Sequence, residues 1–493
     1  MNKKGEVGED IFLGGRSLKW WQIGFSIFSA NAGPMMLIGF AGLGFTHKMA
    51  GANFEWLAWI FLLLLSVIFL PYYLKAGIST IPQFLLIRFG KRSYSFLIAY
   101  SLVSILVVWL GSALYAGGLL ISLIFECSIY LPIMIIAAIA TSFTAVGGLK
   151  AVVRTGIFQS VIIIVSSVCL VFLGLQKIGG VDVLIAKTPS DYWKLFLPSD
   201  NPEYSWVAIL LGYPVVAIYY WCADQTIVQK VLAAKDLKQA QYGTVFIAAL
   251  KIIMPFIFLL PGIMCYVLYQ DSAHADNAYM VMVAQLMPHG FLGLSVAALV
   301  AALIDTVSSS LNSFCTVFTL DLVPLFSKQN KKQQMRMGKW ITVVAAVFGV
   351  AIAMIYANSG NSFFDLTQGL VSILAPPLSV VFLAGICWKR INARAVETVL
   401  YGGGLLCVAI GACNVLNFPY PGFWPHFLML SFYLFLFLAI VVVVVTLLTG
   451  KQQFKTVDMA VLPGELKLHA NRKLQLLWAS LAGIMIFLYL FFN

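Results

Sequence analysis

Long runs of apolar residues recur along almost the entire chain, and they restrict its possible folds more than any other feature. A helix that crosses a lipid bilayer needs about 20 consecutive, mainly apolar residues. Thirteen stretches meet this requirement, at approximately residues 20–45, 53–74, 95–125, 128–147, 152–177, 205–225, 238–268, 291–318, 337–357, 362–388, 396–417, 424–448 and 473–492. Only 10% of the 493 residues are charged, against roughly 25% in soluble domains, which excludes an ordinary soluble globular protein. The sequence therefore predicts an all-α polytopic membrane protein with about thirteen transmembrane helices.

The positions of the basic residues predict how the chain crosses the membrane. If the N-terminus is cytoplasmic and the spans alternate, 26 of the 31 Lys and Arg residues lie on the cytoplasmic side, 4 lie outside and one lies within a span. Cytoplasmic loops of membrane proteins carry such an excess of Lys and Arg. We therefore expect a multi-pass protein of the cell membrane (inner or plasma membrane), with a cytoplasmic N-terminus and an extracytoplasmic C-terminus. The net charge of +12 then requires no nucleic acid partner.

Five ionisable residues lie within or at the ends of the predicted spans and are candidates for function, among them Asp365 at the start of the tenth span. Charged side chains are costly in hydrocarbon and usually face a protein interior or a water-filled cavity. Lys251 and Asp305 have apolar residues on both sides, which argues against side chains that reach back to the lipid headgroups. Glu55 opens the second span, where such reaching back is an equally good explanation, and Asp224 ends the sixth span.

Oxygen-bearing side chains crowd about two helical turns around Asp305 in the eighth span. Thr306, Ser308, Ser309 and Asn312 all follow it closely. Carboxylate and hydroxyl oxygens suit a hard cation. Small residues also permit close helix packing, but packing accounts for the serines and not for a carboxylate at their centre. The pattern therefore favours a cation site.

The first and sixth spans are both interrupted. Residues 29–34, Ser-Ala-Asn-Ala-Gly-Pro, break the first apolar run, and Gly212 and Pro214 lie in the sixth. Gly and Pro release backbone groups from helical hydrogen bonds, and these groups must face a cavity or a neighbour. Transporters place substrate and ion sites at such breaks, in corresponding positions of two inverted repeats. Spans 1–5 and 6–10 are consistent with two such repeats.

Several polar and aromatic side chains form an inventory suited to a sugar. Carboxylate and amide groups can bond to sugar hydroxyls, and aromatic rings can pack against the apolar face of the sugar ring. The candidates are Asn31, Glu55, Tyr220, Trp221, Asp224, Lys251 and Gln368.

Six groups of short motifs follow one another along the chain. They are Gly15-Arg16-Ser17-Leu18 with Trp20-Trp21; Glu55-Trp56; Gly147-Gly148-Leu149 with Ala151-Val152-Val153 and Gln159; Tyr220-Trp221-Cys222-Ala223-Asp224-Gln225 with Val228-Gln229-Lys230 and Ala233-Ala234-Lys235; Leu311-Asn312-Ser313 with Phe318-Thr319-Leu320-Asp321; and Pro376-Pro377 with Trp388-Lys389-Arg390. With these motifs the chain resembles the sodium/solute symporter family, specifically its sodium–glucose cotransporter branch, over nearly its whole length. The resemblance implies a leucine-transporter-like core of ten helices in two inverted repeats, with additional C-terminal helices, that works by alternating access.

The resemblance also implies a sugar site in the middle of the membrane. Its sugar-contacting positions correspond to Asn31, Glu55, Trp221, Asp224, Lys251 and Gln368, and its inner gate corresponds to Tyr220. The retained polar set favours a sugar over proline, pantothenate or iodide, which other branches carry. Met36 stands where sugar transporters often have His or Gln, so one hydroxyl contact is missing and the preferred sugar stays open.

A sodium site is the second implication of the resemblance, with two departures from the usual pattern. The expected ligands are backbone and side-chain oxygens of Ser29, Ala32, Ala302, Asp305, Thr306, Ser308 and Ser309. Asp305 replaces a hydroxyl residue, and Gly156 replaces the usual carboxylate of the fifth helix. Because the two positions lie close together in the family's fold, we expect that the negative charge has moved to the eighth helix and still serves a cation. The oxygen-rich surroundings favour sodium, and a proton on the buried carboxylate is the alternative.

These features predict a secondary active transporter that carries a monosaccharide resembling glucose or galactose into the cell together with Na⁺. The alternatives are sodium- or proton-coupled uptake of another polyol or sugar acid, such as inositol or sialic acid, and a sugar sensor that does not accumulate its ligand. An enzyme with an organic cofactor is not expected, because the 5 His residues are widely spaced and the 8 Cys residues lack metal-binding spacings. The expected partners are the sugar, Na⁺ and the lipid bilayer.

The expected division of the chain follows the two repeats. A cytoplasmic segment covers residues 1–19, the first repeat 20–177, an extracytoplasmic loop 178–204, the second repeat 205–390 and the C-terminal helices 391–493. Family members usually have a further helix before the Gly15-Arg16-Ser17 motif. We expect either that this chain lacks it or that its start codon was placed too late.

Overall fold

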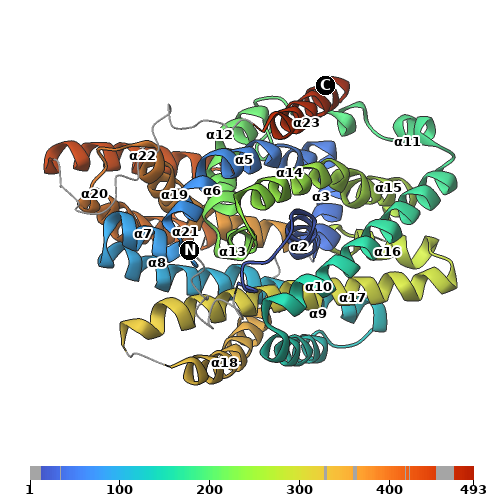
Figure 1. The fold of residues 1–493 in the computed structure, drawn as a ribbon. Helices are drawn as coiled ribbons and strands as arrows, with labels where there is room; N and C mark the ends of the chain where they lie inside the picture. Colours follow the sequence, from blue (N-terminus) through green and yellow to red (C-terminus); the bar gives the residue numbers. More distant parts are fainter. Residues whose placement is uncertain are drawn as a thin grey trace.

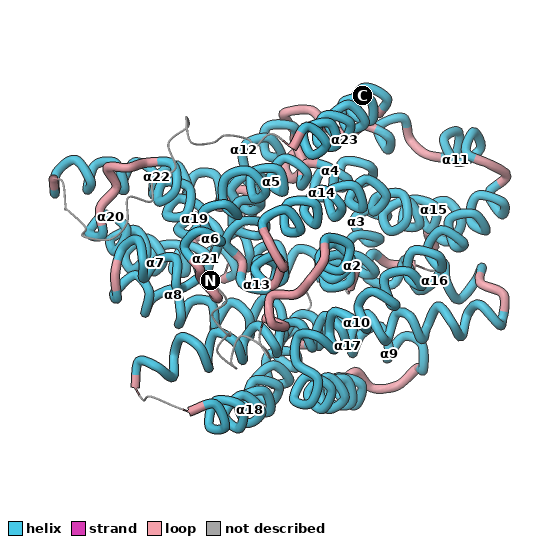
Figure 2. Tube along the Cα trace, in the orientation of Figure 1, coloured by secondary structure: helices cyan, strands magenta, loops and turns pink. Residues whose placement is uncertain are grey.

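Helices make up nearly all of the described part of the chain (Figures 1 and 2). The structure, a computed structural model, describes residues 13–33, 35–271, 273–326, 330–358, 363–416, 418–420, 422–450 and 471–492. Within these ranges the extended pairings are two isolated bridges, Leu18 with Ala234 and Leu197 with Ser205. Residues 1–12 of the expected N-terminal segment, Pro34 of the expected helix break and most of the basic segment before the last span lie outside the described residues.

The elements follow one another with short connections. Through Ile178 they are α2 (Trp20–Asn31), η1 (Met35–Phe40), α3 (Ala41–His47), η2 (Lys48–Ala52), α4 (Asn53–Trp56), α5 (Ala58–Leu64), η3 (Leu65–Phe69), α6 (Leu70–Ala76), α7 (Ile81–Phe89), α8 (Lys91–Ser104), η4 (Ile105–Gly111), α9 (Ser112–Phe125) and α10 (Tyr130–Ile178). After it they are α11 (Val181–Lys187), η5 (Ser190–Trp193), α12 (Trp206–Ile218), η6 (Tyr219–Ala223), α13 (Gln225–Leu232), α14 (Leu237–Met254), η7 (Pro255–Leu259), α15 (Leu260–Tyr269), η8 (Ala275–Asn277), α16 (Ala278–Leu286), α17 (His289–Val317), η9 (Phe318–Leu322), η10 (Val323–Leu325), α18 (Lys331–Ala357), α19 (Phe363–Cys387), α20 (Ala393–Glu397), η11 (Thr398–Gly403), α21 (Gly404–Val415), α22 (Phe427–Thr449) and α23 (Arg472–Phe491).

Eleven helical segments among the described residues are long and apolar enough to cross a membrane. All thirteen predicted stretches are helical, but their boundaries differ in the first third of the chain. The helical run Met36–Ala76 joins the end of the first predicted span to the second. α10 continues through the boundary expected near residue 150 and joins the fourth and fifth predicted spans into one helix of 49 residues, Tyr130–Ile178. Hydrophobicity could not show this continuity, because the boundary was inferred from a short polar interval and not from a helix-breaking Pro.

The break of the first span lies where it was predicted, whereas that of the sixth span lies beyond Gly212 and Pro214, which are inside α12. Each break combines a non-helical residue with a π-helical turn. α2 ends at Asn31, Ala32 has a ψ of 26°, and helical structure resumes in the π-helical η1. α12 passes into the π-helical η6, after which Asp224 is extended, with a ψ of 128°, and precedes α13. Such turns leave backbone groups without regular helical partners and often mark functional sites.

The N-terminal segment is tied to the chain that follows α13. Leu18 donates a backbone hydrogen bond to the Ala233 carbonyl at 3.1 Å and accepts one from the Lys235 amide at 3.1 Å. The Arg16 guanidinium donates to the carbonyl of Ile78 at 3.1 Å and the hydroxyl of Ser79 at 3.2 Å. These hydrogen bonds hold the segment before α2 against the end of α13 and against the loop after α6.

The helix α3 closely approaches η7 and α15 at two glycines, Gly44 and Gly262. A Cβ atom on Gly262 would lie 1.9 Å from the Ala41 carbonyl oxygen, and one on Gly44 would lie 2.2 Å from the Leu259 carbonyl oxygen. Since these oxygens belong to the backbone and cannot rotate away, Gly262→Ala is expected to destabilise the fold by about 1–3 kcal/mol. The melting temperature of the detergent-solubilised protein measures this loss. Gly483→Ala is the control, because its methyl group would meet nothing within 4 Å, and equal losses in both variants would contradict the prediction.

Candidate functional site

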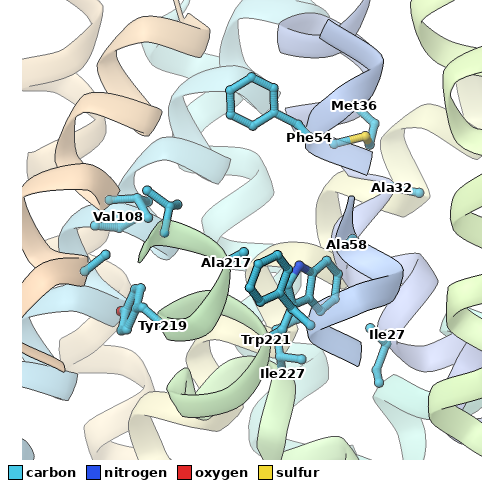
Figure 3. Packing of buried hydrophobic residues seen from close by; sticks show 14 of the residues in the cluster. Ile27, Ala32, Met36, Phe54, Ala58, Val108, Ala217, Tyr219, Trp221 and Ile227 are labelled. Atoms are coloured by element: carbon cyan, nitrogen blue, oxygen red, sulfur yellow. The ribbon is translucent and has the colours of Figure 1, made fainter. Parts of the chain in front are cut away.

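A cavity of about 1020 Å³, including its part open to solvent, lies where the two broken helices meet. Among the residues that line it, the polar and aromatic ones are Asn31, Phe40, Phe54, Glu55, Trp109, Ser112, Tyr213, Tyr220, Trp221, Thr226, Thr306, Ser309, Ser310, Phe364 and Gln368. Figure 3 shows Phe54 and Met36 on one side of this space, and Trp221 and Ile227 on the other. A mainly apolar wall with a few polar groups from several helices is typical of a site for a small molecule.

Lys251, on α14, organises one polar side of the cavity. Its ammonium nitrogen lies 2.5 Å from a Glu55 carboxylate oxygen, donates a hydrogen bond to the side-chain carbonyl of Asn31, and lies 4.7 Å from the centre of the Trp221 ring. Each of these four side chains is at most 7% exposed. Buried charges are tolerated when they are paired and hydrogen-bonded, and an indole face adds attraction for a cation. Lys251 therefore holds three cavity-lining side chains in fixed relative positions, although it does not itself line the cavity.

Tyr220, the predicted gate, belongs to the same cluster. Its hydroxyl accepts a hydrogen bond from the Asn31 side-chain amide at 2.8 Å. Its ring centre lies 4.6 Å from that of Trp221 and 5.3 Å from that of Trp109, and all three rings line the cavity. Gln368, from α19, lines the cavity as well.

Asp224 has a different position from the other predicted sugar contacts. Its carboxylate accepts hydrogen bonds from the Thr226 amide at 2.8 Å, the Trp109 indole at 2.9 Å and the Tyr219 hydroxyl at 3.2 Å. It thereby forms the N-cap of α13 and is not among the residues that line the cavity. Because Trp109 does line the cavity, this geometry gives Asp224 an indirect connection to any ligand there.

A second polar cluster lies on α17, beside the cavity. Both carboxylate oxygens of Asp305 and the hydroxyls of Ser308 and Ser309 are buried and have no hydrogen-bond partner among the described residues. The hydroxyl of Thr306, which follows Asp305 in the sequence, donates to the carbonyl of Ala302, one turn earlier in α17, at 3.0 Å. A buried carboxylate without a partner is costly, and oxygen atoms that lack donors are suited to a cation.

The end of α2 and the middle of α10 both reach this second cluster. A Cβ atom on Gly156 of α10 would lie 2.4 Å from the Ser29 hydroxyl oxygen and 3.1 Å from a carboxylate oxygen of Asp305. This confirms the expected proximity of positions 156 and 305. Ser29 and Ala32 lie at the end of α2, where the last carbonyl groups have no partner within the helix. The predicted ion ligands thus come together from two helices, with Gly156 leaving space for Asp305.

Some residues of the site could not be singled out from the sequence. Phe54, Trp109 and Phe364 line the cavity, but aromatic residues in apolar spans resemble ordinary lipid-facing or core residues. By its basic character the interval 230–238 is expected to be a cytoplasmic loop. Lys230 lies instead within α13, is 2% exposed and donates to the Ser26 carbonyl of α2 at 3.0 Å. The pattern of α13 gives no signal for this burial, because the polar positions of this amphipathic helix are as buried as its apolar ones.

Proteins with known functions resemble the chain along most of its length. The sequence pattern of the family described as "Sodium:solute symporter family" matches residues 11–402. A sodium/glucose cotransporter of Vibrio parahaemolyticus is 33% identical over 424 residues, covering 80% of this chain and 78% of that protein. Sodium/glucose cotransporter 4 of Mus musculus is 33% identical over 455 residues, covering 85% of this chain. The chain spans about two thirds of the mouse protein, 66% of its length.

Solved structures share the fold. A Na⁺-coupled sialic acid symporter in a substrate-bound outward-open state aligns with a TM-score of 0.78 and 21% identity, over 90% of this chain and 93% of that one. MhsT in complex with L-phenylalanine aligns with a TM-score of 0.53 and 14% identity, over 86% and 97%. These similarities confirm the leucine-transporter-like fold class predicted from the sequence. With its family pattern matched over residues 11–402, the chain belongs to the sodium:solute symporter family, whose members are transporters and not enzymes.

Proposed function

We propose that this protein is a sodium-coupled symporter that brings a neutral monosaccharide into the cell by alternating access. The observation that carries the proposal is the juxtaposition of a polar–aromatic cavity with a buried, unpartnered carboxylate at the break of α2. The named relatives are sodium/glucose cotransporters, which supports both the ion and the class of substrate. We place the protein in the cell membrane with a cytoplasmic N-terminus, on the basis of the distribution of Lys and Arg.

The proposed sugar site uses the side chains around Lys251. The Glu55 carboxylate accepts hydrogen bonds from sugar hydroxyls, and the Gln368 amide can accept or donate them. Asn31 is held for the same purpose by its bond from Lys251. The Trp221 ring provides an apolar surface, and Tyr220 separates the cavity from the interior side as a gate. For Asp224, predicted as a sugar contact, the proposal is a contribution through the Trp109 indole that it holds.

The electrostatics of the cavity favour a neutral sugar over a sugar acid. A substrate carboxylate would need an available cation, and the described residues that line the cavity include no Lys or Arg. Lys251 lies behind this wall, and its charge is already balanced by Glu55 at 2.5 Å. An anionic substrate would have to disrupt this buried pair, which is unfavourable.

The proposed sodium site lies at the junction of α2 and α17. Its ligands are the Asp305 carboxylate, the hydroxyls of Thr306, Ser308 and Ser309, and backbone carbonyls of Ser29, Ala32 and Ala302. Thr306 and Ser309 also line the cavity, so an ion bound to them would contact the same helix surface as the sugar. This shared surface gives a direct physical route for coupling the binding of the two substrates.

Uptake of radiolabelled glucose and galactose into proteoliposomes tests the proposal. We expect accumulation above the equilibrium level with an inward sodium gradient and none with an inward proton gradient alone. Accumulation driven by protons alone would mean that the coupling ion is a proton carried by Asp305 and not sodium. Binding of sugar without accumulation under either gradient would overturn the symporter proposal and favour a sensor. Accumulation of inositol or sialic acid, with glucose and galactose inactive, would overturn the assignment of the sugar.

A further inference from the structure

Lys230 is a buried cation that the proposed sugar and sodium sites do not use. It lies on α13, is 2% exposed, and is far from the lipid-facing or solvent-facing positions where a Lys is usually found. Its ammonium group donates to the Ser26 carbonyl oxygen at 3.0 Å. The Ser29 hydroxyl donates to that same oxygen at 3.1 Å. Lys230 is therefore attached to the part of α2 that contributes to the proposed sodium site.

The contacts continue from Lys230 to the carboxylate of Asp305. The Ser29 hydroxyl and one Asp305 oxygen both border the space above Gly156, at 2.4 and 3.1 Å from the Cβ position. α13 packs against α2 and also against α17, which carries Asp305. Among the described residues Lys230 and Asp305 form no direct ion pair, and the contacts between them run through Ser26 and Ser29. In a low-dielectric interior, opposite charges attract strongly even without direct contact.

We propose that Lys230 is a resident counter-cation for Asp305 that sets the affinity of the sodium site. This inference rests on the proposed function, because it requires a coupling ion at Asp305. In the ion-free protein the ammonium balances the buried carboxylate, which has no hydrogen-bond donor among the described residues. When Na⁺ binds, two cations share one carboxylate, so their repulsion weakens ion binding. Lys230 therefore favours release of the ion and stabilises the ion-free form.

The expected effect of removing this charge is tighter binding of sodium. In Lys230→Gln, the sodium concentration for half-maximal sugar uptake should fall by about tenfold, as expected for the loss of one like charge in a partly shielded site. The maximal uptake rate should fall as well, because release of the ion is slower. Lys230→Arg keeps the charge and should retain the sodium dependence of the unchanged protein. Lys238→Gln is the matched control, because Lys238 is exposed at the start of α14.

Thermal stability provides a second readout that does not require transport. Without sodium, Lys230→Gln leaves Asp305 buried with no opposing charge, so its melting temperature in choline chloride should fall. Sodium chloride should then raise the melting temperature of Lys230→Gln more than that of the unchanged protein, since a ligand stabilises the form that binds it. In Asp305→Asn/Lys230→Gln, the extra effect of sodium should disappear. A purely structural lysine would lower stability equally in both salts.

The outcomes separate this inference from the proposed function. If the sodium concentration for half-maximal uptake is unchanged or higher in Lys230→Gln, while the unchanged protein shows sodium-driven uptake, the counter-cation role alone is overturned. Absence of any sodium effect on uptake and stability in the unchanged protein would overturn the proposed function first. The result we expect is a lower sodium concentration for half-maximal uptake in Lys230→Gln, with no such change in Lys230→Arg or Lys238→Gln.

Discussion

Replacing Asp305 with Ala is expected to abolish sodium-driven accumulation of sugar. The side chain is buried and its oxygens have no other partner among the described residues, so its removal deletes the principal charge of the proposed sodium site. Two unit charges about 4 Å apart contribute about 4 kcal/mol at an effective dielectric constant of about 20. This corresponds to roughly a thousandfold in affinity and would move sodium activation beyond the measurable range. Sodium titration of uptake in proteoliposomes is the measurement.

Returning the carboxylate to α10 gives this prediction its sharpest control. Gly156→Asp combined with Asp305→Ser should recover part of the sodium dependence that Asp305→Ser alone loses. The Cβ atom at position 156 would point toward Asp305 at 3.1 Å, and the crowding atom at 2.4 Å is the rotatable Ser29 hydroxyl. Normal sodium-dependent accumulation by Asp305→Ala would refute the relocated charge altogether. Failure of the double variant alone would mean that the precise position of the carboxylate matters.

Lys251→Met is expected to abolish sugar accumulation and to lower the stability of the protein at the same time. The substitution leaves the Glu55 carboxylate buried at 4% exposure with its cation removed, which typically costs about 3–5 kcal/mol. It also releases Asn31 and removes the cation from the face of Trp221, so the cavity wall loses its fixed geometry. Uptake and the melting temperature in detergent together measure these two losses.

A double variant distinguishes the charge balance of this pair from its role in transport. Glu55→Gln together with Lys251→Met removes both charges, so stability should recover most of the loss seen in Lys251→Met, whereas uptake should remain absent. Lys235→Met, at an exposed position, is the control for a change from Lys to Met. If the double variant instead loses as much stability as the two single variants together, the two side chains do not stabilise the protein as a buried ion pair.

The fold could be predicted from the sequence because hydrophobicity and helix length are coupled so strongly in membrane proteins. Each predicted stretch is helical, and the interruption at residues 29–34 indicated the end of α2 at Asn31. The boundaries were less predictable where no Pro stops a helix, because Gly147 and Gly148 do not end α10. α10 continues through such a boundary, and the run Met36–Ala76 joins two predicted spans through short 3₁₀ and π segments that no hydrophobic pattern signals.

The candidate site was predicted in its composition but not in its connections. Asp305 and Gly156 could be related only through the resemblance to a family, since they are 149 positions apart along the chain (305 − 156). Asp224 and Lys230 show the limit of reasoning from residue type. A carboxylate beside aromatic residues fits an N-cap as well as a sugar contact, and a Lys among other basic residues fits a loop as well as a buried site. Burial and partners decide between these roles, and both are tertiary properties.

The pairing of Leu18 with the chain after α13 has a consequence for how this transporter can be studied. Its bonds join backbone atoms, at 3.1 Å in each direction between Leu18 and residues 233 and 235. A systematic replacement of side chains by alanine would therefore leave these backbone bonds intact, and any loss in Leu18→Ala would report the burial of its side chain instead. Only a change that deletes an amide hydrogen, such as proline, would reveal it. The hydrogen bonds that hold the N-terminal segment against the chain after α13 are thus invisible to side-chain substitution alone.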